Sequence, residues 1–306
     1  MKEFSDRVAE PPCRSIFIPA PDGLRLHVCE YGSSTLEALP VVCLPGLTRT
    51  TADFDVIAPA LAYGTPPRRV IALDSRGRGD SEYDPDPQHY NLAIELADLV
   101  AVLKAMQTGR AVFLGSSRGG ILTMLLAASD STAIAGAVLH DIGPVIEPEG
   151  LARIKGYVGK LPPPRSLAEG ASILRRLFEV QFPKLKGEQW LAAAGRAWKN
   201  DGGALVPTYD VQIATTIADF DSARPLPPLW NEFDALTHVP ILVVRGANSD
   251  VLSAATVNAM RARCPGLDSI EVPDQGHVPL LEGAALLQRI AVFVDKCERA
   301  AELPKR

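Results

Sequence analysis

The stretch GSSRGG holds two adjacent serines between one apolar segment and another with helical character. A serine with glycine two residues before it and two residues after it fits a sharp strand-to-helix turn, which raises the hydroxyl above a sheet as a nucleophile. Ser117 has this spacing, with Gly115 and Gly119. Ser116 does not, because leucine and arginine occupy the corresponding positions. A plain glycine turn is the alternative, but the strand–turn–helix context favours Ser117 as a nucleophile.

A serine hydroxyl is a weak nucleophile and needs a base. His277 lies in the loop PDQGH after the last predicted strand, and it follows Ser117 in the chain, as the order serine, acid, histidine requires. We therefore expect His277 to be the base. The other histidines lie in apolar strand patterns or polar segments, where a structural role is expected: His27, His89, His140 and His238.

A third residue is expected to hold the imidazole in the orientation that catalysis needs. Asp250 lies in the loop RGANSD after a predicted strand, between Ser117 and His277 in chain order. Asp141, which ends the apolar run AVLHD, is one rival, and Asp274, close to His277 in the chain, is the other. Because Asp274 is so close to His277 in the sequence, we expect it to be a solvated turn residue. We expect Asp250 to be the acid.

Attack on a carbonyl also needs N–H donors for the oxyanion that forms. One is expected from Arg118, the residue after the predicted nucleophile, and the second from the loop after an early strand. The sequence CLPGLTRT supplies that loop, in which Gly46 allows a turn and Leu47 carries the N–H. A Pro–Gly turn that only ends the strand is the alternative. The Arg118 side chain is expected to pair with a carboxylate of a cap or loop, away from the carbonyl.

These residues need a scaffold that brings distant segments together. Short apolar segments alternate with helical ones over residues 39–144 and again over residues 239–299. This alternation is typical of a mostly parallel, doubly wound α/β sheet. Two further segments, 14–19 and 24–32, are short and β-rich with a PDG turn between them, which predicts an opening β-hairpin.

The alternation stops in the middle of the chain. Residues 145–228 contain helical segments separated by Pro and Gly clusters such as LPPPRS, without an obvious strand. The sequence therefore predicts an α/β core of residues 1–144 and 229–306 and an inserted helical cap of residues 145–228.

Composition excludes several classes of function. The chain of 306 residues has a net charge of -5 and an isoelectric point of about 5.6, which disfavours binding to nucleic acid or to an acidic membrane surface. The polar N-terminal stretch has no apolar signal region, and no apolar run reaches the roughly 18 residues of a membrane-spanning helix. Five scattered cysteines without a C-x-x-C spacing are expected to be reduced, mostly buried thiols of a cytoplasmic protein.

Cofactors and metals are not expected. The sequence contains neither an H-E-x-x-H motif nor a G-x-G-x-x-G motif after a strand. The expected partner is a small-molecule ester, with no nucleic acid and no membrane, and the composition leaves the oligomeric state open.

Four motifs, GSSRGG, DSRGRGDS, RGANSDVL and GHVPLLE, resemble the α/β-hydrolase fold family over nearly the whole chain. VLHDIGPVIEPEGLARIKGYVG and LWNEFDAL are similar to a bacterial branch of small esterases and lactonase-like hydrolases with a helical cap. The resemblance implies a triad of Ser117, Asp250 and His277, with Leu47 and Arg118 as oxyanion donors. Two features depart from the family pattern: arginine follows the nucleophile, and the oxyanion loop lacks the usual His–Gly pair.

The expected function is therefore that of a cofactor-free serine hydrolase of carboxylic esters. Small to medium acyl esters or lactones are the expected substrates, with polyesters if the cap opens. A C–C bond hydrolase or a cofactor-free perhydrolase on the same triad is one alternative. A non-catalytic binding protein on the hydrolase fold is the other.

Overall fold

The computed structural model describes residues 13–302. Eight strands form one sheet in the order β1-β2-β4-β3-β5-β6-β9-β10. β1 pairs antiparallel with β2 and β2 with β4, and the remaining neighbours are parallel. The strands are β1 (Arg14–Pro19), β2 (Arg25–Tyr31), β3 (Val41–Leu44), β4 (Val70–Leu73), β5 (Ala111–Ser116), β6 (Ile134–His140), β9 (Ile241–Gly246) and β10 (Asp268–Val272). The predicted hairpin and mostly parallel sheet are both confirmed.

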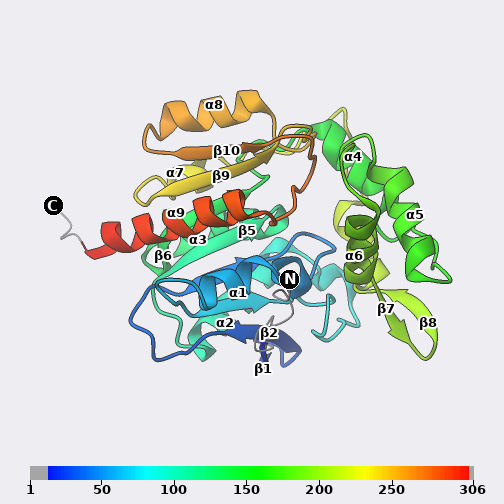
Figure 1. The fold of residues 1–306 in the computed structure, drawn as a ribbon, viewed down its shortest axis with the longest axis horizontal. Coiled ribbons are helices and arrows are strands. Elements are labelled where there is room, and N and C mark those ends of the chain that lie inside the picture. The colour runs from blue at the N-terminus through cyan, green and yellow to red at the C-terminus, as the bar shows by residue number, and fades with distance from the viewer. Residues whose placement is uncertain (1–12, 303–306) are drawn as a thin grey trace, which may run out of the picture.

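Helices cover both faces of this sheet (Figure 1). Alternate side chains of a strand point to opposite faces; Val42 and Leu44 of β3 therefore join one core, and Val41 and Cys43 join the other. The first core contains side chains of α2 (Leu92–Ala105), α3 (Arg118–Ser129), α7 (Trp230–Asp234) and α8 (Ala254–Arg263). The second contains side chains of α1 (Ile57–Ala62) and α9 (Ala284–Glu302).

The chain between β6 and α7 forms a separate group of elements at one end of the molecule (right in Figure 1). These elements are α4 (Pro148–Tyr157), α5 (Leu167–Phe178), α6 (Gly187–Ala197), β7 (Trp198–Asp201), β8 (Ala204–Pro207) and the 3-10 helix η4 (Val211–Ile217). α5 and α6 pack around their own apolar cluster, which includes Leu174, Trp190 and Trp198. The range predicted for the cap, 145–228, contains all of them.

The β7–β8 hairpin in this region differs from the prediction of helices alone. Its turn is Gly202–Gly203, and both residues have positive φ angles, 58° and 93°. Such a turn joins two antiparallel strands tightly. The strands WKND and ALVP are short and mostly polar or small, so their sequence lacks the apolar alternation by which strands are recognised.

The remaining short helices are connectors. They are η1 (Thr51–Phe54), η2 (Pro87–His89) and η3 (Ser131–Ala133). No helix within residues 13–302 is long and apolar enough to cross a membrane.

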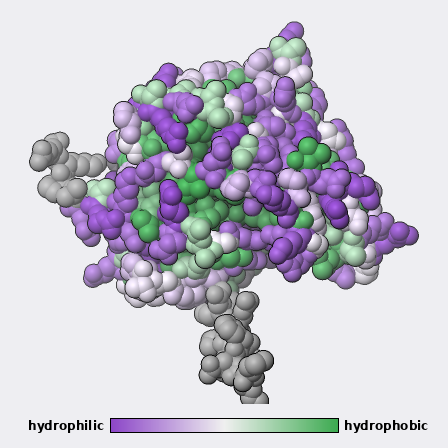
Figure 2. Space-filling model, turned by 45° about the horizontal axis from the view of Figure 1, so that its top comes forward, coloured by the Kyte–Doolittle hydropathy of each residue, from purple (hydrophilic) through white to green (hydrophobic). Residues whose placement is uncertain are grey.

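Figure 2 shows a face on which hydrophilic residues predominate. Hydrophobic residues form smaller patches there, the largest a band near the middle of the view. The most exposed of the large hydrophobic side chains in the described part is Val180, which follows α5 in the cap region and is 88% exposed.

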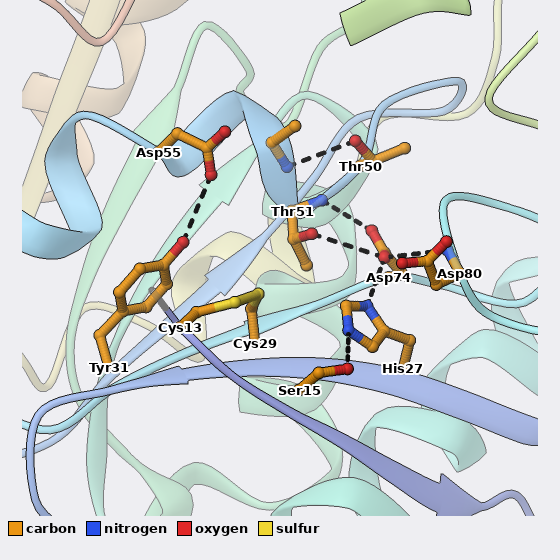
Figure 3. Close-up of a disulfide and its surroundings, with 11 residues drawn as sticks. Cys13, Ser15, His27, Cys29, Tyr31, Thr50, Thr51, Asp55, Asp74 and Asp80 are labelled. Carbon is orange, nitrogen blue, oxygen red and sulfur yellow. Dashed lines mark hydrogen bonds and ion pairs between the residues drawn. A yellow bond between two sulfur atoms is a disulfide. The ribbon is translucent and has the colours of Figure 1, made fainter. Parts of the chain in front are cut away.

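One prediction about the cysteines is wrong. Cys13 and Cys29 form a disulfide between the start of β1 and β2 (Figure 3), whereas reduced thiols were expected. The antiparallel pairing of these two strands brings the two Cα atoms to 5.4 Å, within the range that a disulfide spans. Sequence spacing alone does not reveal such a contact. The other three cysteines, Cys43, Cys264 and Cys297, are free and buried.

Candidate active site

Ser117 lies at a sharp turn between β5 and α3. Its backbone has the left-handed values φ 50° and ψ -114°, and it caps the N-terminus of α3 without a side-chain cap bond. A Cβ at Gly115 would lie 2.5 Å from the backbone of Gly119 and Gly120, and a Cβ at Gly119 would lie 2.1 Å from the carbonyl oxygen of Leu44. Both glycines are therefore required by close backbone contact, as the G-x-S-x-G spacing predicts.

His277 contacts Ser117 from the loop after β10. Its Nε2 lies 2.8 Å from Ser117 Oγ, and its Nδ1 lies 2.8 Å from Asp141 Oδ2. The histidine side chain is 7% exposed, so the imidazole is held in a largely buried position. The structure thus brings together the predicted nucleophile and the predicted base.

Asp141 is the residue directly after β6, the strand next to β5 in the sheet. Its side chain is fully buried, and its φ is 55°. Besides His277, its carboxylate accepts hydrogen bonds from the N–H of Gly246 at 2.8 Å and from Ser249 Oγ at 2.6 Å. These bonds fix the carboxylate so that it orients His277. Ser117, His277 and Asp141 are called the elbow series below.

The predicted pairing of Asp250 with His277 is wrong. Asp250 lies in the loop after β9, as expected, but its carboxylate is bound by Arg153 of α4, with N···O distances of 2.6 and 2.8 Å. Burial would raise the pKa of Asp250, but the hydrogen bonds and charge of Arg153 hold it below the ordinary value. Asp250 therefore ties the core to the cap. Asp141, named as a rival in the sequence, occupies the position beside the imidazole.

Leu47 and Arg118, the residues predicted to bind an oxyanion through their N–H groups, both lie near Ser117. Arg118 is the first residue of α3, where the N–H groups of a helix have no partner within the helix. Leu47 lines the same pocket as Ser117 and His277, and a Cβ on the neighbouring Gly46 would lie 3.6 Å from Ser117 Cβ. Two backbone N–H groups are thus available beside the hydroxyl.

The Arg118 side chain pairs with a different carboxylate from the one expected. Its Nε lies 2.6 Å from Glu95 Oε2, and Glu95 belongs to helix α2 of the core, not to a cap or loop. Glu95 also accepts a bond of 2.9 Å from Arg78, whose Nε donates to the carbonyl oxygen of Leu47 at 2.8 Å. Burial would raise the pKa of Glu95, but the two guanidinium charges outweigh this effect and lower it. A chain of buried polar contacts therefore joins Leu47 to Arg118.

Two pockets that share Arg49 and Val278 lie at the elbow series. The first, called the nucleophile pocket, is lined by core and cap residues: Gly46, Leu47, Thr48, Arg49, Ser117, Ile154, Tyr157, His277 and Val278. The second, called the side pocket, has a more charged lining: Arg49, Ala52, Asp53, Val56, Ser116, His140, Ala193, Arg196, Val278, Pro279, Leu280, Leu281 and Glu282. Gly46, Leu47, Ser117 and His277 were predicted from the sequence, whereas the other lining residues were not assigned to a pocket because no motif marks them.

Ser116 and His140 contact each other in the side pocket. Ser116 Oγ lies 2.9 Å from His140 Nδ1, so the first serine of the pair does not contact His277. Burial lowers the pKa of His140 to about 4, which keeps this imidazole neutral. The expectation of a structural role for His140 agrees with these contacts.

A second series with the same chemical groups lies near the N-terminus of the described chain (Figure 3). Ser15 Oγ lies 2.8 Å from His27 Nε2, and His27 Nδ1 lies 2.7 Å from Asp74 Oδ2. Asp74 also accepts a bond of 2.7 Å from the N–H of Thr51. Ser15, His27 and Asp74 are called the hairpin series below, because the first two residues belong to the β1–β2 hairpin.

One group of side chains within residues 13–302 has spacing compatible with a metal ion. The ligand atoms of Asp22, Asp84 and His89 lie within 4.8 Å of one another. Arg76 contacts both carboxylates, with a distance of 2.9 Å to Asp22. Its guanidinium, which also contacts Asp98, offsets part of the negative charge, so a structural ion-pair cluster accounts for the group.

Comparison with known proteins agrees with this architecture. Residues 41–289 match the alpha/beta hydrolase family. The chain is 33% identical over 273 residues to a 3-hydroxybutyrate-oligomer hydrolase of Cupriavidus necator, covering 85% of this chain and 89% of the relative. It is 34% identical over 255 residues to the sn-1-specific diacylglycerol lipase ABHD11 of Mus musculus, covering 80% of this chain and 76% of that protein.

A solved structure extends the similarity to three dimensions. An alpha/beta hydrolase from Novosphingobium aromaticivorans is 39% identical and has a TM-score of 0.87, covering 93% of this chain and 99% of the other. The sheet order, the elbow at Ser117 and these matches lead to one conclusion: the chain is a hydrolase that belongs to the alpha/beta hydrolase family.

Proposed function

We propose that this protein hydrolyses carboxylic esters through an acyl-enzyme formed on Ser117. The observation that carries the proposal is the elbow series, with a serine on a left-handed turn, an imidazole 2.8 Å from its hydroxyl and a buried carboxylate behind the imidazole. This arrangement can deprotonate a hydroxyl as it attacks a carbonyl carbon.

In the first half of the reaction, Ser117 Oγ bonds to the carbonyl carbon and gives its proton to His277 Nε2. Asp141 accepts a hydrogen bond from Nδ1 and stabilises the imidazolium that forms. The carbonyl oxygen becomes an oxyanion, and the N–H groups of Leu47 and Arg118 are the proposed donors. The C–O bond of the ester then breaks, and the alcohol leaves with the proton from His277.

In the second half, water attacks the acyl-enzyme while His277 takes its proton. Collapse of the second tetrahedral intermediate returns the proton to Ser117 Oγ and releases the carboxylic acid. The net reaction consumes one water and yields one acid and one alcohol, so it needs no cofactor.

Small and medium esters and lactones, including esters of hydroxy acids, are the proposed substrates. Residues of α4 in the cap, Ile154 and Tyr157, line the nucleophile pocket and would limit the size of the acyl group. The relative from Cupriavidus necator, named for the hydrolysis of 3-hydroxybutyrate oligomers, supports esters of hydroxy acids as substrates.

Ser117→Ala is the direct test. We expect kcat/KM for p-nitrophenyl butyrate to fall by a factor of about 10⁴ or more, because the nucleophile is lost. An organophosphonate should label the wild type on Ser117, as located by mass spectrometry, and should not label the variant there. Ser116→Ala is the matched control, since Ser116 Oγ contacts His140 and not His277.

Two results would overturn the proposal. One is full activity of Ser117→Ala with an unchanged melting temperature. The other is a wild type that neither turns over a panel of esters and lactones nor reacts with the organophosphonate, which is the behaviour of a binding protein. Turnover of a vinylogous ketone but of no ester would instead indicate a C–C bond hydrolase.

A further inference from the structure

Arg49 connects the nucleophile pocket with the side pocket. It lies in the loop after β3 that also carries Leu47, and it contributes to the lining of both pockets. Arg196, at the end of helix α6 in the cap, lines the side pocket from the opposite part of the fold. Arg49 therefore lies beside Ser117 and His277 in the nucleophile pocket, and Arg196 lies in the adjoining side pocket.

These two arginines are paired more weakly than most buried arginines of the protein. Arg49 Nε lies 3.6 Å from Asp53, and Arg196 Nε lies 3.4 Å from the same carboxylate. Within residues 13–302, Arg196 Nε has no hydrogen-bond partner although it is buried. By contrast, Arg118 and Arg153 each reach a carboxylate at 2.6 Å. The side pocket thus holds one buried donor, Arg196 Nε, without a hydrogen-bond partner in the described chain, although one nitrogen each of Arg118 and Arg153 also lacks a partner.

Besides the two arginines, the titratable groups that line the side pocket are Asp53, Glu282 and His140. Asp53 is shared by the two guanidinium groups, so each has only part of a counter-charge. Glu282 lies on the lining within 3.5 Å of the Gln189 side-chain amide. His140 is neutral, as described above. In the nucleophile pocket, Arg49 is the one Lys or Arg side chain of the lining, and no Asp or Glu lines it.

We propose that Arg49 and Arg196 bind a free carboxylate of the substrate. This inference rests on the proposed ester hydrolysis. A guanidinium presents paired N–H donors that match the two oxygens of a carboxylate. Because Arg49 lines both pockets, the proposal places the carboxylate in the side pocket and the reacting ester in the adjoining nucleophile pocket, so the carboxylate belongs to the alcohol that leaves. The substrate class is an oligoester of a hydroxy acid, cleaved at the ester bond next to its carboxylate end.

The test compares two substrates that differ only at the terminal carboxyl group, which is charged in one and esterified in the other. They are the linear dimer of 3-hydroxybutyrate and the methyl ester of the same dimer at its carboxylate end. We expect the wild type to hydrolyse the internal ester of the free acid with a kcat/KM at least about tenfold higher, since hydrogen bonds to charged groups are the stronger ones. In Arg49→Gln and Arg196→Gln this ratio should fall toward one, mainly through a higher KM for the acid.

Matched variants separate charge from packing. Arg49→Lys and Arg196→Lys keep the charge and should retain a preference for the acid between those of the wild type and the glutamine variants. Arg175→Gln removes an exposed arginine of α5 that pairs with Glu179, and it should leave the ratio unchanged. A ratio near one in the wild type, or a ratio equally high in both glutamine variants, would overturn the proposal.

A binding measurement keeps this test independent of turnover. In Ser117→Ala, calorimetry should detect tighter binding of the dimer acid than of its methyl ester, and Arg196→Gln should remove the difference. Equal affinities would contradict the carboxylate site even if the protein hydrolyses other esters. Tight, selective binding without any Ser117-dependent hydrolysis would instead contradict the proposed function and leave the carboxylate site standing.

Discussion

The elbow series and the hairpin series contain the same three kinds of side chain at nearly the same distances. The serine–histidine contacts are both 2.8 Å, and the histidine–aspartate contacts are 2.8 and 2.7 Å. The backbone around the two serines differs. Ser117 has a positive φ and begins a helix beside a pocket, whereas Ser15 lies exposed in β1, the edge strand of the sheet.

This difference teaches that a hydrogen-bonded triad is not sufficient to identify a nucleophile. An oxyanion needs N–H donors that are aimed at it and not already bonded. The N-terminus of α3 and the loop at Leu47 are the proposed sources of such donors near Ser117. Ser15 is the second residue of the extended strand β1, so it does not stand at the N-terminus of a helix as Ser117 does. We therefore expect the hairpin series to stabilise the fold and the elbow series to catalyse.

The largest effect is expected from replacing Asp141, the acid of the elbow series. Asp141→Asn should lower kcat/KM for p-nitrophenyl butyrate by a factor of about 10³ to 10⁴, because an amide cannot stabilise the imidazolium or hold the same tautomer. Steady-state kinetics with a melting curve as the folding control would measure this. A loss of less than tenfold would show that Asp141 does not serve His277.

Asp250 is the acid predicted from the sequence, so replacing it tests whether Asp141 or Asp250 serves His277. Asp250→Asn should lower kcat/KM by no more than about tenfold, since Asp250 pairs with Arg153 of α4, whereas Asp141 is the carboxylate that contacts His277. Arg153→Gln should have a similar effect, and the double variant should be no worse than either single one. A loss of kcat/KM as large as that of Asp141→Asn would indicate that Asp250 is the acid that serves His277.

We expect the hairpin series to affect the stability of the folded protein, measured as its melting temperature. Burial would lower the pKa of His27, but the hydrogen bond and charge of Asp74 raise it above the ordinary value of 6.5. A raised pKa means that protonated His27 stabilises the folded state below pH 6.5 and that this contribution is lost as the pH rises through the raised value. The difference in melting temperature between the wild type and His27→Gln should therefore be largest in acid and shrink as the pH rises. A difference that grows with pH would contradict this sign.

The smallest effect is expected at the serine of the hairpin series. Ser15→Ala should change kcat/KM by less than about twofold, because the residue has no aimed oxyanion donors. Organophosphonate labelling followed by peptide mass spectrometry should find no adduct on Ser15 in the wild type. An adduct there would show that Ser15 is also a reactive nucleophile.

Much of the fold was predictable from sequence because it depends on local patterns. Apolar β-rich segments alternating with helices predict the parallel sheet, and the two glycines around Ser117 predict the turn, since both positions are closed to a Cβ. The β7–β8 hairpin and the Cys13–Cys29 contact were missed because neither leaves a local apolar pattern.

The acid of the site could not be chosen from the sequence alone. Asp141 and Asp250 both follow strands that end at the same edge of the sheet. The choice depends on which loop turns toward His277, and Arg153 of the cap, far away in the sequence, already holds Asp250. The one signal that favours Asp141 is that it directly follows its strand, whereas Asp250 lies further along its loop.

The buried contacts from Leu47 through Arg78 and Glu95 to Arg118 have a consequence for the balance between stability and rate. Buried ion pairs cost desolvation energy, and apolar side chains of similar volume often stabilise a fold as well or better. What the chain of contacts provides is a fixed separation between the two proposed oxyanion donors, so that their dipoles need little reorganisation as charge develops. We therefore expect apolar replacements of the three charged side chains to yield a protein that melts no lower and works more slowly.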